Sequence, residues 1–168
     1  MNNANPFTGT WALAEWSVTH TPSGYVHYPF NGNADGHLIY TDNGWVSATL
    51  MEKDRKHVPQ DRHRLVAARM LLNPPKDAPK QDLDIDAQQQ KDIDDLMERF
   101  CLASMGYITY CGPFEVNNDE VQHHIKNSLV PQWVGTTLAR KFDISDNRLT
   151  LSTNEGEFSD KLVWQRIA

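Results

Sequence analysis

The chain has 168 residues, of which 39% are hydrophobic, and a formal net charge of −6 at pH 7. This length fits one domain with a full-sized core, and the negative charge argues against nucleic acid or an anionic membrane surface as a partner. No apolar run approaches the roughly 18 residues that a membrane-spanning helix needs. Residues 1–6 lack the basic and apolar regions of a secretion signal. Cys101 and Cys111 form no metal-binding pattern, so we expect a cytoplasmic protein with two free thiols.

The first third of the chain carries strand and turn signals. A strand is predicted over 10–19, and a loop rich in Gly, Pro and Asn follows from 22 to 36. Residues 37–41 and 45–51 then form a predicted hairpin, because Asn43-Gly44 between them supplies the positive φ that a tight turn demands.

Residues 52 to 87 form a predicted insert that is helical or irregular. Asp61 can cap a short helix that runs to Leu72, and Pro74-Pro75 would end it. The apolar residues 70–72 need cover. Two roles stay open for the insert: a lid over a ligand site, or a contact between two copies of the chain.

The segment 88–104 shows the clearest helical pattern of the chain. Apolar residues recur at steps of three and four and therefore share one face; they are Ile93, Leu96, Met97, Phe100 and Cys101. The opposite face is mostly acidic, which is unlike the basic polar face of a membrane-surface helix. An amphipathic helix of a soluble protein is predicted here.

The last third of the chain is nearly all β. Strands are predicted over 107–116, 121–130, 137–144, 148–153 and 161–167, with turn residues between them. The chain thus holds about eight strands at short spacing, which favours an antiparallel sandwich or an up-and-down barrel over a parallel sheet. Eight strands can close into a barrel with room for one small ligand.

Several short motifs in this order are familiar. They are Gly9-Thr10-Trp11 and the segments 36–41, 107–112, 121–124, 128–135, 148–151 and 162–166. The series resembles the lipocalin-like domain proteins of bacteria and fungi. The likeness covers residues 6–51 and 88–167, and its most specific part is Pro131-Gln132-Trp133-Val134-Gly135.

The resemblance implies a mainly β fold for a single domain, residues 1–168. This fold is an up-and-down antiparallel barrel of the calycin type, with about eight strands, one amphipathic helix and the insert. In lipocalins, a Gly-x-Trp on the first strand packs against an Arg near the last strand and plugs one end of the barrel. Gly9, Trp11 and Arg166 match this arrangement, and Arg over an indole face contributes about 0.5–2 kcal/mol. Related barrels serve as carriers and as enzymes, so the fold does not fix the function.

Strand alternation nominates residues that face the barrel interior, because successive side chains point to opposite faces. The apolar face of 121–129 holds Val121, His123, Ile125, Asn127 and Leu129, and that of 138–144 holds Leu138, Arg140, Phe142 and Ile144. A buried guanidinium keeps its charge and needs partners. Glu15 is a candidate partner if it points inward, which the ambiguous pattern of the first strand leaves open.

The candidate site combines polar groups with an apolar wall. The polar members are Tyr110, His123, Asn127, Arg140 and Tyr40, although the hairpin pattern leaves the face of Tyr40 open; the apolar members are Phe114, Ile125, Leu129 and Phe142. An apolar cavity with a few convergent polar groups is the usual form of a small-molecule site. The alternative is a satisfied polar network inside a filled barrel.

Two functions fit these residues. In the first, the protein is a cofactor-free isomerase or cyclase: His123 moves a proton, Arg140 holds a carboxylate, enolate or phenolate, and Tyr110 or Asn127 donates to a developing oxyanion. In the second, it is a carrier or sensor of a small hydrophobic ligand that the same groups orient. No cofactor is expected, because the 7 histidines show no metal-binding pattern and no Gly-rich phosphate loop is present.

Overall fold

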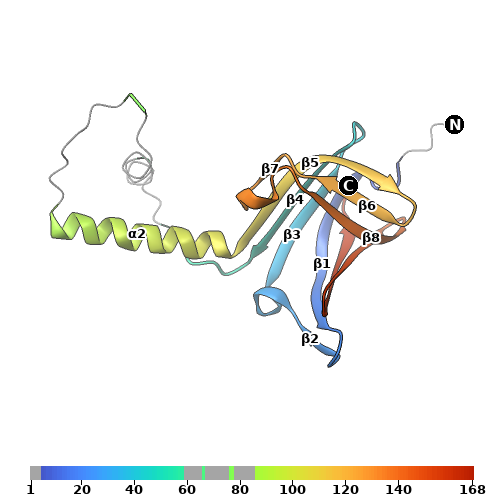
Figure 1. Cartoon of the computed structure of the whole chain (residues 1–168), viewed down its shortest axis with the longest axis horizontal. Coiled ribbons are helices and arrows are strands. Elements are labelled where there is room, and N and C mark those ends of the chain that lie inside the picture. The colour runs from blue at the N-terminus through green and yellow to red at the C-terminus, as the bar shows by residue number, and fades with distance from the viewer. Residues whose placement is uncertain (1–4, 59–65, 67–75, 78–85) are drawn as a thin grey trace. The chain divides into compact units, whose positions relative to one another are not determined.

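The computed structural model describes residues 5–58, 66, 76–77 and 86–168. The chain divides into two compact units, Met1–Asp54 with Gly106–Ala168, and Arg55–Met105. The first unit contains the sheet (Figure 1). The short helix predicted from Asp61 and the apolar residues 70–72 lie outside the described residues, so the predicted roles of the insert stay predictions.

The described strands form a closed antiparallel barrel. Their order around the barrel is β1-β3-β4-β5-β6-β8-β9-β10, and β10 pairs back with β1. Two further strands lie off this ring: β2 pairs with β1, and β7 pairs with β5. The bounds are β1 Gly9–His20, β2 Tyr25–His27, β3 Ala34–Tyr40, β4 Trp45–Glu52, β5 Tyr107–Asn117, β6 Glu120–His124, β7 Asn127–Ser128, β8 Thr137–Ser145, β9 Arg148–Glu155 and β10 Phe158–Arg166.

The predicted up-and-down barrel of eight strands is confirmed, since every ring neighbour is also the next ring strand in the chain. The predicted loop 22–36 is wrong in part. It contains β2, a 3₁₀ turn at Pro29–Gly32 and the first residues of β3. A strand as short as β2 carries too few residues for a period-2 pattern, which is why the turn-forming residues around it dominate the sequence signal.

The described helix of the second unit, α2, spans Ala87–Met105 and confirms the prediction for 88–104. Asp86 caps it: its carboxylate accepts hydrogen bonds from the backbone N–H groups of Gln88 and Gln89, both at 2.8 Å. The Gln89 side chain accepts in return from the backbone of Asp86 at 3.0 Å, which satisfies a further free donor of the helix start. No helix among the described residues has the length and apolar character required to cross a membrane.

Trp11 and Arg166 plug one end of the barrel, as predicted. Trp11 is fully buried, and the Arg166 guanidinium carbon lies 4.0 Å from the centroid of its ring. Arg166 also donates hydrogen bonds to the carbonyls of Pro6, Thr8 and Asp146. A side chain at Gly9 would meet this guanidinium, because an added Cβ would lie 2.6 Å from Arg166 Nη1. The motif Gly-x-Trp therefore fits here for a steric reason.

Replacing Arg166 by Met is expected to lower the free energy of unfolding by about 2 kcal/mol, because the cation–π contact and three charge-assisted hydrogen bonds are lost. Urea denaturation measures this change. The control is Arg148→Met on β9, where the side chain is exposed and the expected change is under about 0.5 kcal/mol. Equal effects of the two substitutions would contradict a structural role of the plug.

An aromatic cluster fills the barrel next to this plug. Phe7 is 1% exposed, and its ring lies 5.1 Å from Tyr40 and 4.9 Å from Phe142 between centroids. Tyr40 and Phe114 are 4.7 Å apart. Such edge-to-face contacts add about 0.5–1.5 kcal/mol per pair beyond area burial. Aromatic rings therefore fill this end of the barrel, and β2 lies at the other end (Figure 1).

Candidate functional site

His123 lies in the barrel interior between two tyrosines. Its exposed fraction is 0%. Nε2 is 2.8 Å from the Tyr40 hydroxyl, and Nδ1 is 2.9 Å from the Tyr110 hydroxyl. The three side chains come from different strands: β3, β5 and β6. The inward orientation predicted for Tyr110 and His123 is found in the structure, and Tyr40, whose face was left open, also points inward.

Hydrogen-bond accounting assigns the protons of this trio. A neutral imidazole has one N–H donor and one acceptor nitrogen. Tyr40 is 1% exposed and has no hydrogen-bond partner other than His123 among the described residues. If Tyr40 accepted the bond, its own proton would be buried without a partner, at a cost of about 1–3 kcal/mol. Tyr40 therefore donates to Nε2, and the Nδ1–H of His123 donates to Tyr110.

The Tyr110 hydroxyl is the last group in this series of hydrogen bonds. Its oxygen accepts the bond from His123, and no other described residue bonds to it. Tyr110 is half-buried, in contrast to Tyr40. Its O–H is thus an unused donor that faces the barrel interior.

Burial controls the protonation of the trio. Desolvation lowers the pKa of His123 from 6.5 to about 3, with smaller contributions from the charges of Arg140 and His124. Desolvation also raises the pKa of Tyr110 to about 12 and that of Tyr40 well above its usual range. All three side chains are therefore neutral at pH 7.

Arg140 supplies the interior charge. It lies on β8 in the inward set with Phe142, and its register neighbour Val121 is fully buried. Its positive charge lowers the pKa of Tyr40, Tyr110 and His123, and also that of Asp160 on β10. The strand register places Arg140 beside Thr153, because Lys141 pairs with Ser152, and Thr153 in turn pairs with Asp160.

Glu15 is not the partner of Arg140. A register shift between Leu13 and Glu15 turns Glu15 outward, where it forms an ion pair of 2.9 Å with Lys161. Past the shift, Trp16 faces inward, and its Nε1 donates to Asp160 at 2.7 Å. The ambiguous alternation of the first strand has this cause: a bulge exchanges the two faces midway.

Two of the residues predicted to line the interior, Asn127 and Leu129, do not do so, whereas Ile125 is buried with 1% of its surface exposed. Asn127 is exposed and donates to the outward-facing Cys111 Sγ at 3.6 Å, and Leu129 is 39% exposed. The predicted strand 121–130 breaks after His124. In β7 Asn127 pairs with Cys111, so the alternation restarts with the opposite parity.

A pocket opens at the end of the barrel opposite the plug. Its volume is about 160 Å³, and it is lined by Val18, Thr153, Glu155, Phe158 and Asp160. Sequence reasoning missed these residues, because β10 begins at Phe158, three residues before its predicted start, and Val18 changes face at the bulge. The alternation of inward and outward side chains along β9 and β10 could have identified these pocket residues.

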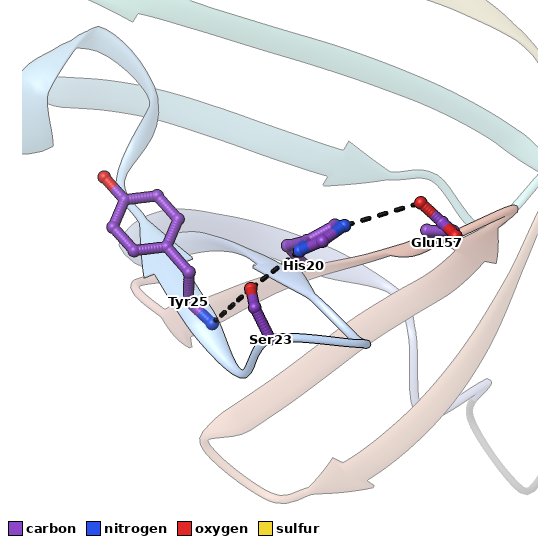
Figure 2. A network of polar contacts seen from close by, with 4 residues as sticks. All are labelled: His20, Ser23, Tyr25 and Glu157. Atoms are coloured by element: carbon purple, nitrogen blue, oxygen red, sulfur yellow. Dashed lines mark hydrogen bonds and ion pairs between the residues drawn. The ribbon is translucent and has the colours of Figure 1, made fainter.

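A small polar network lies next to the pocket residue Phe158, whose ring is 5.2 Å from that of His20; Figure 2 shows the network. His20 Nδ1 lies 2.7 Å from Ser23 Oγ, and His20 Nε2 lies 3.5 Å from the Glu157 carboxylate. The backbone N–H of Tyr25 donates to Ser23 Oγ at 3.3 Å. These contacts join the turn between β1 and β2 to the turn between β9 and β10.

Among the described residues, no group of three His, Cys, Asp or Glu side chains is placed to hold a metal ion. Cys101 and Cys111 are both free. The polar groups of the interior and the pocket are the neutral trio, the Arg140 cation, the Thr153 hydroxyl and the carboxyls of Glu155 and Asp160.

Comparisons with known proteins give the family. A family model described as lipocalin-like domain matches residues 8–73 and 67–167, and no curated protein matches the chain.

Solved structures similar to this chain include an uncharacterised protein from Bacteroides eggerthii, which is 14% identical, with 96% of this chain and 99% of that chain covered and a TM-score of 0.42. A designed fluorescence-activating β-barrel is 10% identical, with 99% of each chain covered and a TM-score of 0.40. A variant of the fluorescent protein UnaG is 10% identical, with 95% of each chain covered and a TM-score of 0.37. Since the family model spans nearly the whole chain, the protein belongs to the lipocalin-like domain family.

Proposed function

We propose that this barrel binds one small, largely apolar molecule that carries an oxygen acceptor. The apolar body occupies the pocket at the open end, and the oxygen faces the Tyr110 hydroxyl and Arg140. The observation that carries the proposal is the pocket itself, which lies at the end of a barrel whose other end is plugged. Lipocalin-like family membership supports the same use of the barrel.

The size of the pocket limits the enclosed part of the ligand. Its volume of about 160 Å³ is close to that of an engineered cavity of about 150 Å³ that binds benzene. Phe158 in its wall is 49% exposed, so a longer ligand can extend past the rim into solvent. The enclosed part is therefore the size of one ring or a short alkyl chain.

We propose binding rather than proton transfer because His123 is poorly suited to act as a base. Both of its ring nitrogens are occupied by tyrosine hydroxyls. Its pKa of about 3 also lies far from the range near neutrality that favours general acid–base catalysis. In this proposal, His123 fixes the orientation of Tyr110, which presents its O–H to the ligand.

The proposal is tested by filling the pocket. Thr153 lines it, whereas the neighbouring Ser152 pairs with the outward-facing Lys161 and points to the other face of β9. Native mass spectrometry of the chain purified from its own cells is expected to show a bound small molecule. Thr153→Trp is expected to lose this mass, at least about tenfold in occupancy, because the indole takes the ligand's volume.

Ser152→Trp is the matched control and is expected to retain the bound mass. A ligand that stays bound in Thr153→Trp, or no ligand in any preparation together with no binding of small aromatic probes, would contradict the proposed function.

A further inference from the structure

We infer that the ligand is an organic anion whose acid group docks on the Arg140 guanidinium, opposed by the carboxylate of Asp160. This inference rests on the proposed function and adds the charge of the ligand. It follows from the partners that the interior residues have and lack.

Arg140 has little of its hydrogen-bonding capacity satisfied. A guanidinium carries five N–H donors, and the one hydrogen bond of Arg140 among the described residues runs from Nη1 to the neighbouring Ala139 carbonyl at 3.0 Å. None of the ion pairs among those residues involves Arg140. A cation on the inner face of a barrel needs an acceptor, and an acid group matches the planar fork with two parallel bonds.

The second free donor of the interior points to the same ligand chemistry. The Tyr110 O–H is unused after its oxygen accepts from His123. Arg140 and Tyr110 both donate, and both occupy inward-facing positions, on β8 and β5. A ligand group that only accepts hydrogen bonds and carries negative charge satisfies both donors, whereas an amine satisfies neither.

The charge state of Asp160 controls how strongly an anion binds at Arg140. Its carboxylate lines the pocket and is held by Trp16 Nε1 at 2.7 Å, rather than by Arg140. When ionised, it repels an anion at Arg140. The charged groups that face it are Arg140 from β8, Glu155 from β9 and His27 from β2. Desolvation first and Glu155 next raise the pKa of Asp160, against the hydrogen bond of Trp16 and the charges of Arg140 and His27.

A consequence for pH follows from this arrangement. As the pH falls toward the raised pKa of Asp160, the carboxyl becomes neutral and its repulsion of the ligand disappears. Binding of an anion that stays ionised is therefore expected to tighten as the pH falls into the range in which the Asp160 carboxyl protonates, while binding of a neutral molecule of the same shape stays constant.

The test uses two probes that differ in charge alone, naphthalene-2-sulfonate and naphthalene-2-sulfonamide, titrated into the full chain by calorimetry. The sulfonate is ionised over the whole pH range and the sulfonamide is neutral. We expect the sulfonate to bind about tenfold or more tightly than the sulfonamide, because its negative charge strengthens the hydrogen bonds that Arg140 donates.

Arg140→Gln is expected to remove this preference while the sulfonamide still binds, which also shows that the variant is folded. Lys141→Gln is the matched control, since Lys141 is exposed on the opposite face of β8 and pairs with Asp119; it is expected to keep the preference. Asp160→Asn is expected to tighten sulfonate binding severalfold at pH 7.5 and to remove its pH dependence.

The outcomes separate the two proposals. If neither probe binds the wild-type chain, both the proposed function and this inference fail. If both probes bind equally, or if Arg140→Gln keeps the preference, the inference fails and the proposed function stands. A pH dependence that survives Asp160→Asn would overturn the role of Asp160.

Discussion

Gly112→Ala is expected to lower the free energy of unfolding by more than about 3 kcal/mol, or to prevent folding altogether. Gly112 is buried in β5, and an added Cβ would lie 1.8 Å from the His124 carbonyl oxygen and 3.1 Å from the Lys126 backbone nitrogen. Both contacts are with backbone, which cannot rotate away as a flexible side chain can. Urea denaturation followed by tryptophan fluorescence measures the loss.

The strain at Gly112 would also reach the site. The chain leaves β6 at His124 and crosses close over Gly112, where Lys126 donates to the Cys111 carbonyl at 2.9 Å. Pushing this crossing outward moves the neighbouring His123 away from Tyr40 and Tyr110. Probe binding is therefore expected to weaken together with stability in any folded fraction.

Gly156→Ala is the control for this substitution. Gly156 has a φ of +60° and no atom within 4 Å of the position that an added Cβ would take, so only the backbone cost of about 1–2 kcal/mol applies. If Gly112→Ala unfolds within about 1 kcal/mol of the wild-type chain, the tight crossing of His124 over β5 is wrong.

The sequence predicts the architecture well because the ring strands are long and separated by strong turn residues. Asn43-Gly44 fixes one hairpin, and α2 shows a helical period from Ile93 to Cys101. The two strands outside the ring are predicted poorly because they are short: β2, Tyr25–His27, falls within a predicted loop, and β7, Asn127–Ser128, is merged with β6 into one predicted strand over 121–130. Their pairing is set by the neighbouring strands rather than by their own residues.

The prediction of site residues succeeds where a strand alternates regularly between inward and outward side chains, and it fails where this alternation is interrupted. Tyr110 and Phe114 lie on the uninterrupted part of β5, and Arg140 and Phe142 lie on β8, so parity places them inside. Parity fails beyond His124 because the chain must cross Gly112 before it pairs again.

Contacts between residues that are far apart in the chain are the second feature that could not be predicted from the sequence. Nothing in the order of residues shows that Tyr40 and Tyr110, which are far apart in the chain, meet on the two nitrogens of one imidazole. The bulge near Glu15 likewise becomes visible only in the pairing of β1 with β10. Whether an interior polar group is occupied or free depends on these contacts, and so does the choice between a catalytic and a binding role.

His123 is expected to make the barrel markedly less stable in mild acid. Its pKa falls from 6.5 to about 3 on folding, so between these values the unfolded chain binds a proton that the folded chain does not. The stability from the neutral imidazole is complete above about pH 6.5 and is lost as the pH falls toward 3. At about 1.36 kcal/mol per pKa unit, the loss reaches about 4 kcal/mol at pH 3 and about 2 kcal/mol at pH 5.

The contribution of His123 is isolated by comparing the pH dependence of variants rather than their absolute stabilities. His123→Gln cannot titrate, so its free energy of unfolding, measured in urea from pH 7.5 to pH 4.5, is expected to change less with pH than that of the wild-type chain by about 2–3 kcal/mol. His124→Gln removes the adjacent, half-exposed histidine beside Thr137 and is expected to keep the wild-type slope.

A buried imidazole that bonds through both nitrogens resists protonation, because an imidazolium must donate from both nitrogens. Protonation would force the Tyr40 proton to turn away with no acceptor to receive it. If His123→Gln and His124→Gln show the same slope as the wild-type chain, the imidazole is accessible to protons and the neutral trio of Tyr40, His123 and Tyr110 does not exist.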